Sequence, residues 1–235
     1  YVIASNKNAP TQTVISGDTP SLTAALFEFE KAGLDAKRIP VSAAFHSKIV
    51  SPAKDSLKNV LESFTLHEPV IPIYSNVTAK PYPGSVPESI QLLVTQVAAP
   101  VEWQQIVENM KNDGADIFIE VGPKWALTSF VKDILKGDAV AVPSNHPKKG
   151  GLFHFLDSLG AIYCSGRELD FASLGIETVT VNPVEASTLV TPLGECDDIE
   201  AIISKHVSSA VKEVREKMVP IKKEEDVFVT GISPV

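Results

Sequence analysis

The chain has 235 residues, a mass of 25.2 kDa and a formal net charge of −8 at pH 7. Hydrophobic residues make up 44% and charged residues 21%, which is ordinary for a globular protein and excludes wholesale disorder and collagen-like repetition. An acidic chain without a basic stripe is a poor candidate for nucleic-acid binding. Two cysteines, Cys164 and Cys196, form neither a disulfide framework nor a structural zinc site by themselves. They suit a reducing compartment, so we expect a cytoplasmic location.

The first forty residues are predicted to form two strands, a helix and a third strand. Short β-rich runs at 1–5 and 12–16 are separated by the turn-forming residues 6–10. Asp18 or Thr19 can cap a helix that has Pro20 in its first turn and ends at Gly33. The run from Lys37 to Ser42 then predicts another strand.

Helices and apolar strands alternate from there to about residue 164. The 3.6-residue period of apolar side chains predicts helices from about 52 to 64 and over 87–97, 101–110, 125–135 and 151–164. Strands are predicted over 70–74, 116–121 and 139–142, and Pro72 places the first of them at a sheet edge or bulge. Apolar strands separated by helices are typical of a parallel α/β sheet.

The sequence changes character after about Gly166. Residues 175–198 have no clear period, and residues 199–218 predict an amphipathic helix that ends before Pro220. The charged run 222–226 is typical of a linker, and the strand-like run 227–233 ends as the opening of another domain would. The chain begins in strand-like sequence without an initiator Met. We therefore interpret it as a segment of a longer polypeptide.

One histidine of the five differs from the others by its surroundings. His46 lies in the stretch Val41-Ser42-Ala43-Ala44-Phe45-His46-Ser47, among small residues, after a predicted strand and before a predicted helix. Functional groups of α/β folds are commonly placed at such junctions. A structural histidine is the alternative. The sequence contains no Gly-x-Ser-x-Gly, no phosphate-binding Gly-Lys loop and no His-Glu-x-x-His.

Five segments, taken in chain order, resemble the malonyl-CoA:acyl-carrier-protein transacylases and the acyltransferase domains of polyketide and polyunsaturated fatty acid synthases. The resemblance covers roughly residues 1–165, which correspond to the C-terminal half of the family's domain. The segments are Asn6-Lys7-Asn8-Ala9-Pro10-Thr11-Gln12-Thr13-Val14-Ile15-Ser16-Gly17, Ala44-Phe45-His46-Ser47, Ile73-Tyr74-Ser75-Asn76-Val77-Thr78, Gln96-Val97-Ala98-Ala99-Pro100-Val101-Glu102-Trp103 and Ile119-Glu120-Val121-Gly122-Pro123.

This resemblance implies an α/β fold, namely the C-terminal part of an α/β-hydrolase-like acyltransferase with a partial ferredoxin-like subdomain. Residues 1–40 would form the small subdomain, and residues 41–170 the large subdomain and its helical tail. Residues 171–235 would form a linker with the amphipathic helix and the start of a next domain. Because half of the sheet would be missing, we expect the isolated chain to expose strand edges and to be poorly soluble.

The resemblance also implies a mechanism, in which an acyl group passes through a serine ester. His46 would be the general base, and the backbone carbonyl of Gln96 would orient its imidazole. The family's nucleophilic serine and carboxylate-binding arginine lie upstream of the matching region, so we expect this chain to be inactive alone. Malonyl-CoA would be the acyl donor, and the phosphopantetheine of an acyl carrier protein the acceptor. No metal and no tightly bound cofactor are expected.

Three further residues are candidates for substrate contact by resemblance. Phe45 precedes His46, and its bulk would favour malonyl over methylmalonyl groups, although Ala43 departs from the His common in the malonyl-type signature. Asn6 and Asn8 would lie near the acyl-CoA entrance, or they form a turn. A core role is the alternative for Phe45.

Two other functions are kept open. The chain could be a non-catalytic scaffold that docks neighbouring synthase domains through its helix at 199–218, or a fragment of another α/β-hydrolase. A Cys–His nucleophile is disfavoured, because Cys164 lies in an apolar helical run and is expected to pack. Trp103 and Trp125 are expected in the core, and the four other histidines at the surface or at junctions.

Overall fold

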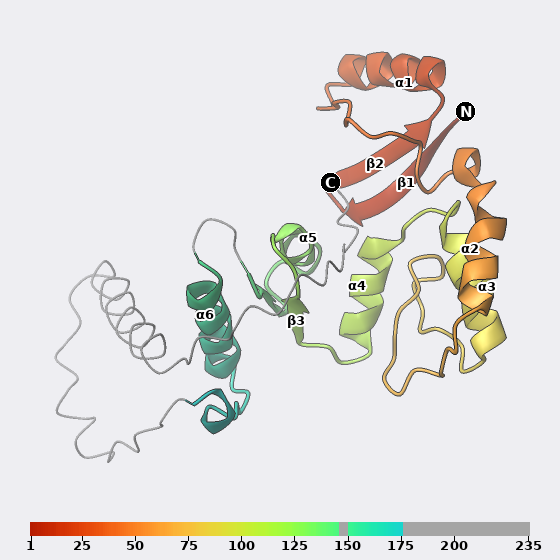
Figure 1. The fold of residues 1–235 in the computed structure, drawn as a ribbon. Coiled ribbons are helices and arrows are strands. Elements are labelled where there is room, and N and C mark those ends of the chain that lie inside the picture. Colours follow the sequence, from red (N-terminus) through yellow and green to blue (C-terminus); the bar gives the residue numbers. More distant parts are fainter. Residues whose placement is uncertain (146–149, 176–235) are drawn as a thin grey trace, which may run out of the picture. The chain divides into compact units, whose positions relative to one another are not determined.

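The computed structural model describes residues 1–145 and 150–175 of the chain (Figure 1). The chain divides into two compact units, residues 1–148 and 149–235, which we describe separately. The predicted helix at 199–218 and the strand-like run at 227–233 lie outside the described residues. The predicted domain boundaries near residues 40 and 170 stay predictions.

The first unit begins with an antiparallel hairpin. Strands β1 (Val2–Ala9) and β2 (Gln12–Gly17) pair from Val2 with Gly17 to Ala9 with Gln12. The predicted turn at residues 6–10 is therefore wrong for residues 6–9, which belong to β1. The turn is shorter because the last pair leaves only two residues between the strands. A Cβ at Gly17 would lie 2.1 Å from the carbonyl oxygen of Tyr1, so only glycine fits there.

Helix α1 (Thr19–Lys31) follows the hairpin and packs on both of its strands (Figure 1). Asp18 caps it, because its carboxylate accepts a 2.9 Å hydrogen bond from the backbone N–H of Ser21. The strand predicted over residues 37–42 is wrong, since this stretch has no regular secondary structure. A β-rich run becomes a strand only when another strand pairs with it, and none of the described residues does so.

Two helices form the next layer of the first unit. The 3₁₀ turn η1 (Lys48–Val50) leads into α2 (Ala53–Glu62), which packs against α3 (Val86–Gln96). The strand predicted over residues 70–74 is wrong, because only an isolated bridge between Tyr74 and Pro81 forms there. Val70 is 100% exposed, so its apolar character is not explained by burial in this chain.

The main core lies where α4 (Trp103–Asn112) and α5 (Ala126–Leu135) pack together beside two strands. Strands β3 (Ile117–Glu120) and β4 (Val140–Pro143) are parallel, which confirms the predicted strand direction for this pair. The core cluster is formed by buried and partly buried apolar side chains of these elements: Val107, Val131, Ala141, Trp103, Phe118, Ile134 and Leu135.

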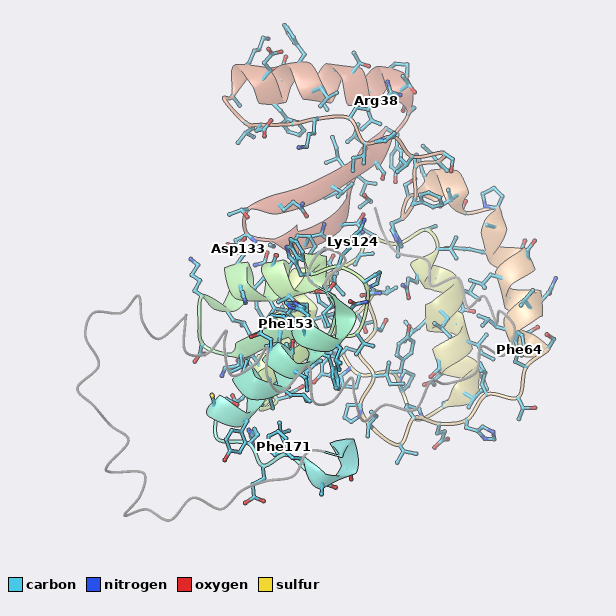
Figure 2. The ribbon with its side chains drawn as sticks, turned by 60° about the vertical axis from the view of Figure 1, so that its left-hand side comes forward. Arg38, Phe64, Lys124, Asp133, Phe153 and Phe171 are labelled. Carbon is cyan, nitrogen blue, oxygen red and sulfur yellow. The ribbon has the colours of Figure 1, made fainter. Side chains whose placement is uncertain are left out.

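The second unit contains α6 (Gly151–Cys164) and the short 3₁₀ turn η2 (Ala172–Leu174). The ring of Phe171, labelled in Figure 2, lies edge-on to Tyr163 with centroids 5.4 Å apart. His154 is buried within α6, and Cys164 is exposed. The expectations of a surface His154 and a packed Cys164 are therefore wrong, because the helix turns these residues toward the opposite sides from those that their neighbours in sequence indicated.

Candidate active site

His46 lies in a tight turn rather than directly after a strand. Its backbone φ is +54°, in the left-handed region that residues other than glycine rarely adopt. The η1 turn and α2 follow it, so the helical side of the predicted junction is present. The strand side is absent, as described above for residues 37–42. The turn leaves the imidazole half-buried.

The imidazole of His46 meets the C-terminal end of α3. Its Nδ1 lies 3.2 Å from the backbone carbonyl oxygen of Gln96. Because a carbonyl only accepts hydrogen bonds, this contact requires a proton on Nδ1. The neutral ring then carries its free lone pair on Nε2, which is the atom that can accept a proton from another group.

The Gln96 carbonyl is available because of the residue four positions later. Gln96 is the last residue of α3, and its carbonyl would normally accept from the N–H of residue 100. Position 100 is Pro100, which has no N–H. Only the N–H of Ala99 approaches the carbonyl from within the chain segment, at a long 3.4 Å. The oxygen therefore keeps a lone pair for His46.

The segment after Pro100 is fixed by the hairpin. The N–H of Val101 donates to the Ser5 carbonyl at 2.8 Å, and the N–H of Lys7 donates to the Val101 carbonyl at 2.9 Å. The Lys7 ammonium also pairs with the Glu102 carboxylate at 2.7 Å. Strand β1 thus holds the chain directly beyond the Gln96 carbonyl.

The other predicted site residues lie apart from the His46 imidazole contact. The side chain of Phe45 is 52% exposed. Asn6 accepts a 3.1 Å hydrogen bond from the Ser5 hydroxyl, and Asn8 donates at 2.8 Å to Gln12 across the hairpin. Both asparagines are therefore engaged within the hairpin, and their proposed contact with acyl-CoA stays a prediction.

The Glu-Val-Gly-Pro segment forms the connection between β3 and α5. The N–H of Gly122 donates to the Ser144 hydroxyl at 3.3 Å, which ties this connection to the residue after β4. Trp103 packs on the core cluster as expected. Trp125 is 43% exposed, so its predicted core position is wrong; it precedes α5 and lies on the outer side of the connection.

Residues 1–145 and 150–175 contain no group of three or more His, Cys, Asp or Glu side chains that could hold a metal ion. Among the same residues, no helix combines the length and apolar character needed to cross a membrane.

Sequence reasoning named the Gln96 carbonyl by resemblance alone and missed the reason for its availability. The signal was present in the sequence, because a proline four residues after a helical residue leaves that residue's carbonyl without its normal donor. The left-handed turn at His46 was also missed. No glycine marks it, so composition carried no signal for it.

Comparison with known proteins identifies the family. Residues 1–168 match the family described as the acyl transferase domain. The polyketide biosynthesis malonyl CoA-acyl carrier protein transacylase of Bacillus subtilis is 38% identical over 140 residues, which are 59% of this chain and 48% of that protein.

Solved structures agree with this match. The malonyl CoA-acyl carrier protein transacylase of Clostridium perfringens superposes with a TM-score of 0.63 at 32% identity, covering 72% of this chain and 52% of that one. A type II polyketide synthase acyl-carrier protein in complex with its malonyl-transacylase gives a TM-score of 0.59 at 31% identity, covering 67% of this chain and 50% of that one. The chain spans about half the length of these relatives. With most of its described residues matched, the chain belongs to the acyl transferase domain family.

Proposed function

We propose that this chain is part of an acyltransferase that moves a malonyl group from coenzyme A to an acyl carrier protein through a serine ester. His46 is the general base of this reaction. The single observation that carries the proposal is the 3.2 Å contact between His46 Nδ1 and the Gln96 carbonyl oxygen. It leaves Nε2 as the basic atom of a neutral imidazole, which is what activation of a serine hydroxyl requires.

In the first half-reaction, Nε2 takes the proton of the serine hydroxyl while the serine oxygen attacks the thioester carbonyl of malonyl-CoA. The tetrahedral intermediate collapses as the carbon–sulfur bond breaks. Nε2 then gives its proton to the leaving coenzyme A thiolate. The products are the malonyl-serine ester and free coenzyme A, and His46 is neutral again.

The second half-reaction repeats these steps with another thiol. Nε2 takes the proton of the phosphopantetheine thiol on the carrier protein, and the sulfur attacks the serine ester. The carbon–oxygen bond breaks, and the proton returns to the serine oxygen. A neutral carbonyl on Nδ1 fixes the tautomer throughout, although it stabilises the imidazolium less than a carboxylate would.

The serine and the arginine that pairs with the malonyl carboxylate are supplied from outside these 235 residues in this proposal. Two facts support this: the sequence contains no Gly-x-Ser-x-Gly, and the matched relatives are about twice as long as the aligned region. In the complete domain, the described elements would complete an α/β-hydrolase-like large subdomain, with the hairpin and α1 as part of a ferredoxin-like small one. The chain alone is then inactive.

The acyl group and the partners are part of the same proposal. Phe45, exposed directly before His46, would line the acyl pocket and favour malonyl over methylmalonyl groups. An acyl carrier protein accompanies its transacylase in one structural neighbour, and a multidomain polyunsaturated fatty acid synthase is among the relatives. We therefore propose a carrier protein and neighbouring synthase domains as partners, and a cytoplasmic location.

The test is malonyl loading from labelled malonyl-CoA in the natural full-length polypeptide. His46→Ala should reduce the loading rate by about 10²–10⁴-fold, the usual effect of losing a general base. His67→Ala is the matched control, because His67 is exposed and lies outside the candidate site. Near wild-type loading by His46→Ala would remove His46 from the mechanism. Ester formation on the 235-residue chain alone would show that its nucleophile lies within it.

A further inference from the structure

We propose that Ser47 is a positioning residue that holds the His46 imidazole against the Gln96 carbonyl. The catalytic consequence rests on the proposed function of His46. The effect on the imidazole itself does not, because it follows from the geometry of the turn. None of the known matches assigns a role to this serine.

The turn at His46 needs something to hold it. Among the described residues, only three other than glycine have a positive φ: His46, Ala79 and Lys136. Lys136 is the ordinary left-handed residue that ends α5. Ala79 lies in a turn whose carbonyl accepts from the Asn109 side chain at 2.7 Å. His46 likewise persists in an unfavourable conformation only where its surroundings impose it.

Ser47 supplies that restraint from both sides of His46. Its hydroxyl donates to the Ala44 carbonyl at 2.6 Å, two residues before the histidine. The same oxygen accepts from the N–H of Ile49 at 3.2 Å, three residues after it. One hydroxyl therefore closes the backbone around His46, and no other side-chain hydrogen bond of the described residues does so.

The hydroxyl is placed for this task by its burial. Ser47 is 0% exposed, although Phe45 is 52% exposed. Water cannot readily replace the Ser47 hydroxyl at that position, so its removal leaves the Ala44 carbonyl without this donor. The turn can then relax from the left-handed conformation, and the Nδ1–carbonyl contact is lost with it.

A simpler role for Ser47 is that of an ordinary cap. Its hydroxyl caps the η1 turn, and a cap affects stability alone. The two roles differ in what happens to the imidazole. A cap leaves the His46 tautomer unchanged, whereas a positioning residue controls it.

The experiment follows the histidine tautomer by ¹⁵N NMR of the histidine-labelled full-length polypeptide. The His46 signals are those missing from a His46→Gln variant. We expect wild-type His46 to be a single Nδ1–H tautomer and Ser47→Ala to give a mixture in which Nε2–H gains. Ser47→Thr, which keeps the hydroxyl, should restore the Nδ1–H form at least in part.

Kinetics provide the second measurement. Ser47→Ala should lower kcat for malonyl loading about 10–10²-fold with KM within about twofold, because misplacing a catalytic group by about 1 Å has effects of that size. Ser63→Ala is the matched control. The Ser63 hydroxyl also donates to a backbone carbonyl at 2.6 Å, that of Val60, but at the end of α2. It should leave both tautomer and kcat unchanged.

The outcomes separate this inference from the proposed function. A folded Ser47→Ala variant with a single Nδ1–H tautomer and unchanged kcat would overturn the inference. If Ser47→Ala does not fold, Ser47→Cys keeps the volume with a weaker donor, and an unchanged tautomer there would overturn it equally. If His46→Gln loads malonyl normally, the proposed function fails, and the tautomer measurement still decides the role of Ser47.

Discussion

The carboxylate of Glu120 is predicted to be a major contributor to the stability of the first unit. Glu120 is the last residue of β3, and its side chain reaches the first turn of α5. One carboxylate oxygen accepts from both the N–H and the hydroxyl of Thr128, each at 2.7 Å. The other accepts from the N–H of Leu127 at 3.3 Å. Trp125, at the N-cap position, makes no side-chain cap, so Glu120 performs that function.

The size of the effect follows from these contacts. Thr128 is 5% exposed, so its N–H and hydroxyl cannot readily turn to water when the carboxylate is removed. Each buried donor left without a partner costs about 1–3 kcal/mol. The Leu127 contact is long and adds little. Glu120→Ala should therefore lower the free energy of unfolding by about 3 kcal/mol, and Glu120→Gln, which keeps one acceptor, by about half as much.

Urea denaturation of the natural polypeptide, followed by tryptophan fluorescence, measures this loss. Trp103 and Trp125 flank the region, so both report on it. The matched control is Glu62→Ala, because Glu62 is 52% exposed and pairs with Lys58 only at 3.8 Å. Such an exposed helical pair contributes about 0.3–0.5 kcal/mol.

The reasoning makes a further demand on the pair of residues. Because Glu120 and Thr128 share one hydrogen-bonded unit, their substitutions should not be additive. Thr128→Val in the Glu120→Ala background should cost clearly less than in the wild type. Additive effects, or a Glu120→Ala loss equal to that of Glu62→Ala, would refute the cap.

Three other predictions test separate parts of the chain. Phe45→Ser should raise methylmalonyl relative to malonyl use by up to about 10–200-fold in kcat/KM, and an unchanged ratio would place Phe45 outside the acyl pocket. Pro100→Ala restores an N–H that competes for the Gln96 carbonyl and should lower kcat by up to about 10²-fold, while kcat equal to wild type would show that no competition occurs. The hydrogen bond to Asp113 raises the pKa of Tyr74 above 10.0, so its stabilisation is complete below pH 10 and is lost as pH rises further. Absorbance titration of tyrosinate should show this late step disappear in Asp113→Asn.

Much of the first unit could be predicted from sequence because its helices carry their own signals. Apolar residues at helical spacing located α2 to α5 to within a few residues, and Asp18 with Pro20 marked the start of α1. The parallel direction of β3 and β4 followed from the helix between them, since a short connection cannot join parallel strands.

The two strands that failed, over residues 37–42 and 70–74, show what sequence does not contain. A helix satisfies its backbone within one segment, whereas a strand depends on a partner elsewhere in the chain. Residues 6–9 show the converse: turn-forming asparagines stay extended because β2 pairs with them and a bridge joins Asn6 to Val101. Local propensity was overridden by a long-range partner in each case.

Strand β1 gives the candidate site its coherence, although it contributes no group to the proposed proton transfer. At its start, the ring of Tyr1 lies 4.1 Å from the ammonium of Lys48, two residues after His46. Further along, Ser5 and Lys7 pair with the backbone of Val101, five residues after Gln96. One strand therefore restrains both segments that form the His46–Gln96 contact. A hydrogen bond weakens steeply as its angle closes, so a catalytic pair drawn from two distant loops requires such a common restraint. We infer that the hairpin serves the chemistry by fixing this geometry.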